Sequence, residues 1–382
     1  MKIGIVGGGY AGIISAILIK KKNPNYEVFL YEGNTQLGKK LSMTGSGRCN
    51  LGNRIVDDHS YNVSEAYEIL ENCPLPKQIE ILNSLGILTT DVGRYVYPHS
   101  LSAKAYVSAL ERILERLGVC VRLNSKLMGY RHEKEYVDLF FYDGHISHVD
   151  RLVITCGGST FAKTGSDGSV FSILKEHNYS ITPLRQGLGA VMTLEDTKTI
   201  LHERLKCVVS LKEGSKVYYK EEGEIIFKKD GISGICAFNS QSVIERFRLK
   251  KPVLSFDIIP DYSEEQLLSF LKKNESVIQS DFLKGLFTAP VSNYLRKRLD
   301  SIDNVSIIKL LKNFEFTYSG LYDFDDAIVT IGGVKLSDLS GLQSKTERNV
   351  YFAGEVLDID GLCGGYSLMM AFAGAYKVSE DI

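Results

Sequence analysis

Residues 3–12 read Ile-Gly-Ile-Val-Gly-Gly-Gly-Tyr-Ala-Gly, a short apolar run that turns through glycines into a helical stretch over residues 13–22. In such a turn Gly7 permits the tight bend, Gly9 lets a diphosphate approach the backbone, and Gly12 lets the helix pack on the strand. The N-terminus of the helix then offers unpaired N–H groups to the anion. This stretch predicts the first strand and helix of a dinucleotide-binding Rossmann unit.

A second apolar run, residues 27–31, ends at Glu32, twenty residues after Gly12. A carboxylate at this spacing accepts hydrogen bonds from the adenosine ribose, and its charge disfavours a 2′-phosphate at the same place. The dinucleotide is therefore predicted to be FAD or NAD rather than NADP.

Length and composition set the class of protein. A chain of 382 residues predicts two or three domains, and 45 Lys and Arg against 46 Asp and Glu leave no overall field for nucleic acid or an anionic membrane. Neither a cleavable signal pattern nor an apolar run near the ~18 residues of a membrane span is visible, so we expect a cytoplasmic protein. The seven cysteines contain no CxxC pair and the histidines are scattered, so we expect no disulfide framework and no metal site.

Hydrophobic periodicity divides the rest of the chain. Helices are expected at 62–72, 74–86 and 101–117, and strands at 119–123, 136–142 and 146–156. From residue 189 the pattern changes to short strand-like pieces, and from 263 to 311 it becomes helical. The strand-like pieces are 190–193, 207–212, 216–220, 224–227 and 253–257. Strands are expected again at 327–331 and 349–353, before a last helix that starts at Gly364-Gly365-Tyr366.

The strand and helix expected at the C-terminal end of the chain, a C-terminal return to the first sheet, favour FAD over NAD. Glu355 follows the apolar run 349–353, and the Gly-Gly helix start follows nine residues later. In flavoproteins on this sheet, a carboxylate after the last strand binds the ribitol and the next helix points its N-terminus at the flavin. A plain NAD dehydrogenase does not need this return. The loop 38–50, with Lys39, Lys40 and Arg48, is either part of a phosphate or flavin site or a solvated basic turn.

Six motifs together resemble one known family, the BaiN/YhiN-type flavoproteins, also catalogued as the aminoacetone oxidase family of FAD-binding enzymes. The motifs are GGGYAG at 7–12, GKKLSMTGSGRCN at 38–50, YPHS at 97–100, CGGSTFAKTGSDG at 156–168, GISG at 231–234 and YFAGEVLDIDGLCGGY at 351–366. The resemblance covers nearly the whole chain and is weakest over about 189–325.

The resemblance implies an α/β fold, a Rossmann-like FAD-binding domain of the two-dinucleotide-binding-domain flavoprotein type with an inserted module. The FAD-binding domain is expected to be discontinuous, over residues 1–188 and 326–382. The inserted substrate module is expected at 189–325, with a β-barrel-like, β-rich part at 189–258 and a helical part at 262–312.

The resemblance also implies noncovalent FAD and a set of cofactor-binding residues, with no metal. These residues are Gly7, Gly9, Tyr10, Ala11, Gly12, Glu32, Lys40, Gly45, Gly47, Arg48, Cys49, Asn50, Gly157, Gly354, Glu355, Gly365 and Tyr366. Tyr10 departs from the commoner family pattern, which has a small residue there.

No catalytic acid or base is identified by the sequence. The candidates near flavin-type motifs are Arg48, Tyr97, His99 and Tyr366, each of which also has a structural interpretation. His99, for example, is suitably placed to cap or orient the helix that begins near Ser102. Cys49 and Cys363 flank the expected flavin loops, but neither has a partner thiol nearby in the sequence.

The predicted function is that of an FAD-dependent oxidoreductase. Because only one dinucleotide fingerprint is present, a dedicated NAD(P)H domain is not expected. Either a small amine such as aminoacetone reduces FAD and oxygen reoxidises it to give hydrogen peroxide, or transiently bound NAD(P)H reduces FAD, which reduces an unsaturated substrate. The family name favours the oxidase, with a small molecule and molecular oxygen as partners and neither nucleic acid nor membrane. A flavin-binding RNA-modification or sensor protein is the alternative of another class.

Overall fold

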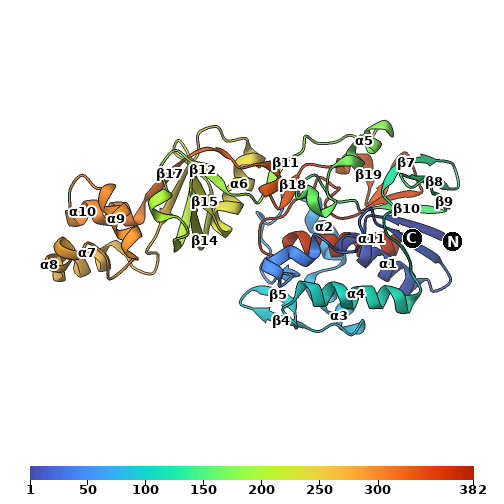
Figure 1. Ribbon diagram of the computed structural model, residues 1–382, viewed down its shortest axis with the longest axis horizontal. Helices are drawn as coiled ribbons and strands as arrows, with labels where there is room; N and C mark the ends of the chain where they lie inside the picture. Colours follow the sequence, from blue (N-terminus) through green and yellow to red (C-terminus); the bar gives the residue numbers. More distant parts are fainter. The chain divides into compact units, whose positions relative to one another are not determined.

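The computed structural model describes residues 1–382 and divides into two compact units (Figure 1). Unit 1 comprises residues 1–186 and 328–382, and unit 2 comprises residues 187–327. The sequence-based boundaries separate an FAD-binding domain from a substrate module, and that functional assignment of the two units stays a proposal.

Unit 1 is organised around a seven-stranded sheet in the order β19-β20-β21-β10-β1-β2-β6. Five of these strands are parallel neighbours, and counted along the chain their order is 3-2-1-4-5, which is the Rossmann order. The predicted Rossmann-type fold is thus confirmed. The strands are β1 (Lys2–Val6), β2 (Glu27–Tyr31), β6 (Cys120–Arg122), β10 (Arg151–Ile154) and β21 (Val350–Phe352), with the antiparallel edge β19 (Leu339–Ser340) and β20 (Gln343–Ser344).

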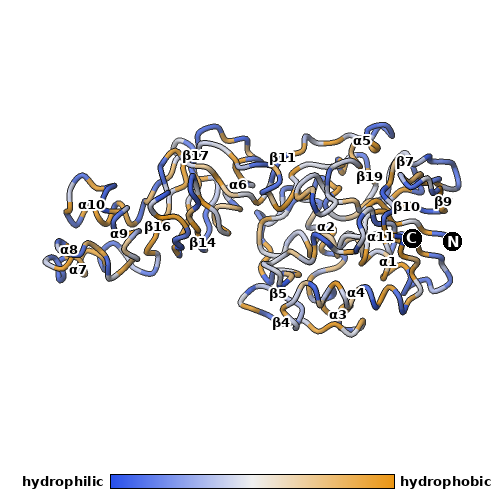
Figure 2. Tube along the Cα trace, viewed as in Figure 1, coloured by the Kyte–Doolittle hydropathy of each residue, from blue (hydrophilic) through white to orange (hydrophobic).

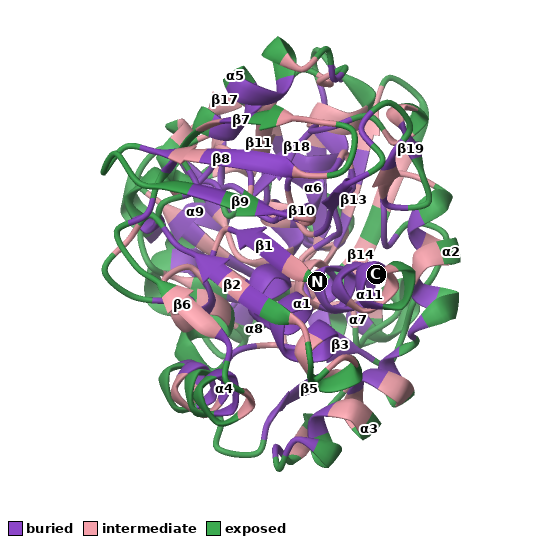
Figure 3. Cartoon of the chain, turned by 90° about the vertical axis from the view of Figure 1, so that its right-hand side faces the viewer, coloured by how far each residue is buried: buried purple, intermediate pink, exposed green.

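Helix α1 (Tyr10–Lys22) is the central helix of unit 1. It contacts α11 (Tyr366–Asp381) and α4 (Ala103–Leu117), and it is buried from residue 10 to residue 19. A helix that is apolar on every side must be covered on every side, which accounts for its place between the sheet and two other helices. In Figure 3 the central strands are accordingly purple, whereas the outer helices carry green stretches. No helix combines the length and apolar character needed to cross a membrane.

A small antiparallel sheet covers the opposite face of β1 and β2. It consists of β7 (Leu127–His132), β8 (Val137–Phe141) and β9 (Ile146–Val149). A Cβ placed on Gly4 would lie 3.0 Å from Val149 and 3.1 Å from Leu139, so glycine lets the two sheets approach closely. The Tyr31 hydroxyl donates to Ser147 across the same contact, at 2.6 Å.

The remaining elements of unit 1 are shorter. They are β3 (Gly52–Asn53), α2 (Glu65–Asn72), α3 (Leu75–Ser84), β4 (Thr89–Val92), β5 (Tyr95–Pro98), α5 (Ser169–Glu176), β18 (Val329–Ile331) and β11 (Arg185–Gly187), whose last residue is the first of unit 2. Helix α4 shows the amphipathic pattern expected from its sequence, because blue and orange alternate along it in Figure 2. Its side-chain cap is Ser102, which accepts from the backbone N–H of Ala105.

Unit 2 contains a closed six-stranded barrel in the order β12-β15-β14-β13-β16-β17. Its strands are β12 (Val191–Thr193), β13 (Arg204–Glu213), β14 (Lys216–Lys228), β15 (Gly231–Ser233), β16 (Val253–Asp257) and β17 (Phe314–Leu321). Its helices are α6 (Ile235–Phe247), α7 (Glu264–Lys273), α8 (Glu275–Asp281), α9 (Ala289–Lys297) and α10 (Asn304–Lys312). Helix α7 begins with a capping box between Ser263 and Gln266.

Three expected elements differ from the structure. The run 146–156 forms two strands, β9 and β10, in different sheets, because Asp150 leaves the small sheet and accepts from Lys2 N at the start of β1. The pieces 216–220 and 224–227 form one long strand, β14, whose polar first half is exposed beside β13. Helix α6 lies inside the stretch expected to be β-rich. It buries polar residues, Asn239 to Ser242, so apolar periodicity does not mark it.

Strand β17 was not predicted, although its apolar residues alternate. Phe314 and Phe316 are fully buried, with their rings 4.7 Å apart, and Tyr294 of α9 packs against both. β17 pairs with β12 and β16 and thereby closes the barrel. This closure depends on residues more than 100 positions apart in the chain, which local pattern analysis does not detect.

A buried polar cluster joins three parts of unit 1. The Glu347 carboxylate lies 2.7 Å from His177 Nδ1 and accepts from the hydroxyls of Tyr130 and Tyr179, each at 2.7 Å. His177 Nε2 lies 3.0 Å from the carbonyl oxygen of Tyr130, so both ring nitrogens face acceptors, an arrangement that the doubly protonated ring satisfies. Burial raises the pKa of Glu347, but the hydrogen bonds from His177, Tyr130 and Tyr179 outweigh it and hold that pKa below its usual value.

We expect Glu347→Gln to lower the free energy of unfolding by about 2–3 kcal/mol at pH 7, because it removes the carboxylate that accepts from Tyr130 and Tyr179 and faces the partly buried His177 ring. Glu176→Gln, an exposed neighbour of His177, is the control and should change it by less than about 0.5 kcal/mol. A carboxylate with a lowered pKa stabilises the fold above its unfolded-state pKa and loses that contribution as the pH falls. Urea unfolding should therefore show the deficit shrinking below about pH 4. An equal loss of unfolding free energy at pH 7 and below about pH 4 would contradict this assignment.

Candidate dinucleotide-binding site

The glycine turn after β1 has the geometry that a dinucleotide diphosphate requires. Gly7 has φ +105°, and a Cβ there would lie 2.4 Å from the carbonyl oxygen of Thr155. A Cβ on Gly12 would lie 2.0 Å from the carbonyl oxygen of Gly7, whereas one on Gly9 would meet nothing within 4 Å. Gly7 and Gly12 are thus required by packing, and Gly9 leaves open space before the N-terminus of α1. The turn therefore fits a diphosphate.

Glu32 lies at the end of β2, facing this turn. One carboxylate oxygen accepts from Gly8 N at 2.7 Å, and the other accepts from Asn34 N and Asn34 Nδ2 at 2.7 and 2.6 Å. A carboxylate offers about four lone-pair sites, so one remains for a ribose hydroxyl. Glu32 therefore both holds the glycine turn and can bind a ribose. Asn34, which also donates to Thr164 O, was missed in the sequence.

Glu355 and Lys40 form an ion pair that joins the C-terminal return to the loop 38–50. Lys40 Nζ lies 2.7 and 3.0 Å from the two Glu355 oxygens. The same carboxylate accepts from Thr330 N at 2.9 Å and from the Thr160 hydroxyl at 3.3 Å. The lysine thus neutralises the charge of the Glu355 carboxylate.

Thr330 of β18 is a second residue that the sequence analysis missed. Its hydroxyl accepts from Ser159 N at 2.8 Å and from Thr160 N at 3.2 Å, and it is buried. A Cβ on Gly158 would lie 2.2 Å from the same hydroxyl. Gly157, a predicted cofactor residue, has φ +77° in the same turn. Thr330 therefore shapes the turn after β10, and its only sequence signal was its place in an expected strand.

The start of α11 lies against the loop 45–50. Gly365 is the N-cap, has φ +94°, and a Cβ there would lie 2.7 Å from the Asn50 side-chain amide. Gly354 has φ +81°, and its Cβ would lie 2.7 Å from the Cβ of Ala11. The structure thus brings the first helix, the loop 45–50 and the C-terminal return to one place, with Gly45 and Gly47 also at positive φ. Their predicted roles in binding FAD stay predictions.

Two predicted tyrosines have structural hydrogen bonds. The Tyr10 hydroxyl lies 2.9 Å from the Tyr106 hydroxyl, and the Tyr366 hydroxyl donates to Ile55 O at 2.8 Å. Burial raises the pKa of both phenols above the ordinary value. Both hydroxyls thus have hydrogen-bond partners within unit 1. The predicted roles of Tyr10 and Tyr366 at the cofactor stay predictions.

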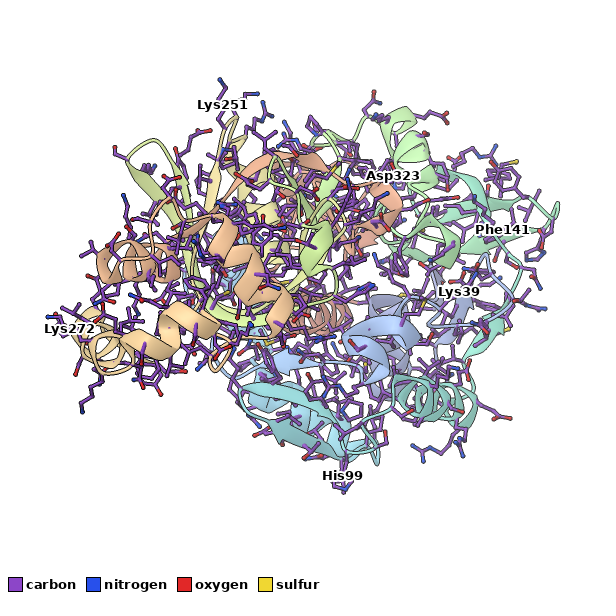
Figure 4. The ribbon with its side chains drawn as sticks, turned by 60° about the vertical axis from the view of Figure 1, so that its left-hand side comes forward. Lys39, His99, Phe141, Lys251, Lys272 and Asp323 are labelled. Carbon is purple, nitrogen blue, oxygen red and sulfur yellow. The ribbon has the colours of Figure 1, made fainter.

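The other candidate reactive residues differ in how far their side chains are buried. Cys49 is fully buried, and burial raises its pKa to about 12, so it is a neutral thiol at pH 7. His99 is exposed and projects outward at the bottom of Figure 4, and it does not cap α4, because Ser102 does. Tyr97 is buried on β5, and the Arg48 guanidinium lies 5.2 Å from the centre of its ring. Only Arg48 and Tyr97 remain together near the start of α11.

Comparison with known proteins gives a match over residues 1–381 to the family described as HI0933-like protein Rossmann domain. The chain belongs to this family. The BaiN/YhiN-type resemblance is thereby confirmed, and with it the coarse class of an FAD-dependent oxidoreductase.

Several relatives align over almost their whole length. A 3-dehydro-bile acid delta(4,6)-reductase of Clostridium scindens is 28% identical over 98% of this chain and 97% of its own. A ribosomal RNA dihydrouridine synthase of Escherichia coli is 23% identical over 99% of this chain and 97% of its own. Among solved structures, a 3-ketosteroid-delta4-(5alpha)-dehydrogenase of Rhodococcus jostii has a TM-score of 0.50 and 12% identity, covering 99% of this chain and 95% of that one. The last likeness shows the fold alone.

We expect Glu32→Gln to weaken FAD binding roughly 10- to 100-fold, because a neutral amide loses the charge-assisted hydrogen bonds to Gly8 N and to the ribose. Glu27→Gln, an exposed position on the same strand, is the matched control and should leave the affinity unchanged. Fluorescence titration of flavin-free protein with FAD measures both. Equal affinity of the two variants would contradict a role for Glu32.

We expect Lys40→Gln to weaken FAD binding at least tenfold, because the Glu355 carboxylate is then left without its cation in the candidate site. Lys39→Gln is the control, since Lys39 is not in an ion pair. The double variant Lys40→Gln/Glu355→Gln should recover part of the loss if the two charges are coupled. The single variant Glu355→Gln completes this double-mutant cycle. If the losses in affinity of the two single variants add up to that of the double variant, the ion pair does not act as a unit.

Proposed function

We propose that the protein is an FAD-dependent reductase that adds hydrogen across a carbon–carbon double bond, with NAD(P)H as the reductant. The observation that carries this proposal is the full-length similarity, at 28% identity, to a protein named as a bile acid reductase. Two further full-length relatives are named for dihydrouridine, a base to which two hydrogens have been added. Both names refer to saturation of a double bond rather than to oxidation of an amine.

The residues of unit 1 would divide the binding of FAD among themselves. The turn Gly7–Gly12 would hold the diphosphate at the start of α1, and Glu32 would hold the adenosine ribose. Lys40 and Glu355 would lie at the ribitol, and the loop 45–50 and Gly365 at the flavin. Bound there, the flavin ring supplies two-electron hydride chemistry. The protein orients the ring, and the N-terminus of α11 favours negative charge beside it.

NAD(P)H is proposed as a transient reductant. Within the sheet of unit 1 only the turn after β1 has the glycine spacing of a dinucleotide site. At the turn after β10 the Thr330 hydroxyl accepts from Ser159 N and leaves no room for a Cβ on Gly158. A second nucleotide would therefore bind without a Rossmann turn of its own. Unit 2 is proposed as the substrate module.

The amine oxidase is the less supported alternative, because it rests on the family name. An RNA substrate is the second candidate, and the 23% similarity to a ribosomal RNA dihydrouridine synthase favours it. The near balance of 45 basic and 46 acidic residues weighs against it, since nucleic-acid binding depends on basic surfaces. We therefore propose a small molecule as the substrate.

Anaerobic titration of the purified full-length protein tests the proposal. We expect NADPH or NADH to bleach the flavin band and cyclohex-2-enone to restore it in the absence of oxygen. A band that stays oxidised with both nucleotides but is bleached by aminoacetone would establish the oxidase instead. Restoration by a ribosomal RNA transcript and by no small enone would establish the RNA substrate. Absence of any flavin band would contradict the cofactor.

A further inference from the structure

Arg48 is a basic residue without a carboxylate partner. It lies in the loop 45–50, which is proposed to contact the flavin. Its side chain is exposed, and its contact is with the ring of Tyr97, 5.2 Å from the guanidinium carbon to the ring centre. Three other basic side chains of unit 1 have carboxylate partners: Lys40 has Glu355, Arg54 has Asp91 and Lys126 has Asp167. No ion pair is formed by Arg48.

The backbone around Arg48 is held in place although the side chain is exposed. Gly45, Ser46, Gly47 and Cys49 all have positive φ, between 55° and 82°. Arg48 N donates to Gly45 O at 3.1 Å, and the side chain of Cys49 is fully buried. Two non-glycine residues in a left-handed conformation within five positions are costly, and such conformations concentrate at functional sites.

The same loop fixes Arg48 near the start of α11. The Asn50 amide lies against Gly365, the N-cap of that helix. Leu51 N donates to Val96 O at 2.8 Å, which joins the loop to β5, the strand of Tyr97. The guanidinium and the Tyr97 ring are therefore carried by two segments that both meet the N-terminal end of α11.

We propose that Arg48 is a catalytic residue that binds an oxygen of the substrate, the carbonyl or amide oxygen conjugated to the double bond that is reduced. This inference rests on the proposed reductase function. Hydride adds to the β carbon, the π electron pair of the double bond shifts toward the carbonyl oxygen, and a solvent proton then joins the α carbon. Arg48 stabilises the negative charge on that oxygen, with NAD(P)H as the source of the hydride.

The choice of an arginine defines the substrate class. A guanidinium stays charged and presents N–H donors in a plane, so it stabilises a developing oxyanion without transferring a proton. The guanidinium lies over the Tyr97 ring, and burial raises the pKa of Tyr97, so this ring stays neutral. An unpaired cation at this place also disfavours a cationic amine. The arrangement therefore selects unsaturated carbonyl compounds over small amines.

Substitution of Arg48 tests this role with two readouts, each expressed per bound flavin. The first is kcat/KM for cyclohex-2-enone with NADPH, which should fall about 100-fold in Arg48→Gln. The second is the dissociation constant of 4-chlorophenolate, an enolate mimic, followed by the change in flavin absorbance; it should rise at least tenfold. Arg48→Lys should recover part of both losses. Arg54→Gln, whose guanidinium is paired with Asp91, is the matched control and should stay within twofold.

The outcomes separate this inference from the proposed function. Wild-type affinity for 4-chlorophenolate in Arg48→Gln, or equal losses in Arg48→Gln and Arg54→Gln, would overturn the role of Arg48. A wild-type protein that consumes oxygen with aminoacetone and reduces no enone would overturn the reductase; tenfold weaker phenolate binding in Arg48→Gln would then still support an oxyanion site. A wild-type protein that neither reduces cyclohex-2-enone nor binds 4-chlorophenolate would overturn both the reductase and the role of Arg48.

Discussion

The close approach of the first glycine turn to the end of β10 is the constraint on which the site depends. The Thr155 hydroxyl lies 2.9 Å from Val6 O and 2.8 Å from Gly7 O, and its backbone leaves no room for a Cβ on Gly7. Because this contact sets where β1 ends, it also sets where α1 begins and where its unpaired N–H groups point. On the other side of the turn, Glu32 accepts a hydrogen bond from Gly8 N.

Much of this could be predicted from the sequence because the signals are local. The spacing Gly7, Gly9 and Gly12 reports steric limits within one turn, and Glu32 follows at the distance set by one helix and one strand. Helices α4 and α7 were visible from the periodicity of their apolar residues. These features depend on neighbours within about twenty residues.

The unpredicted parts depend on distant partners or on buried polar groups. Thr330 matters because β18 lies beside the turn at Ser159 and Thr160, a pairing of segments about 170 residues apart. Helix α6 escaped notice because its buried face includes Asn239 and Ser240 rather than an apolar stripe. Tyr10 looked like a departure at a cofactor position, whereas its hydroxyl pairs with Tyr106 in the core. In each case a tertiary contact decides the role of a residue.

The chain's two ends build the candidate site together, and this couples the cofactor to the fold of unit 1. Ala11 of the first helix meets Gly354, and Lys40 pairs with Glu355, so segments more than 300 residues apart form adjacent walls. A ligand that binds only when both segments are in place stabilises the folded state by mass action. The residues of the loop 45–50 in the left-handed conformation destabilise this folded arrangement, since each costs conformational energy. A dinucleotide held by both walls would offset this cost, and so the same contacts that bind it would also hold Arg48 in position.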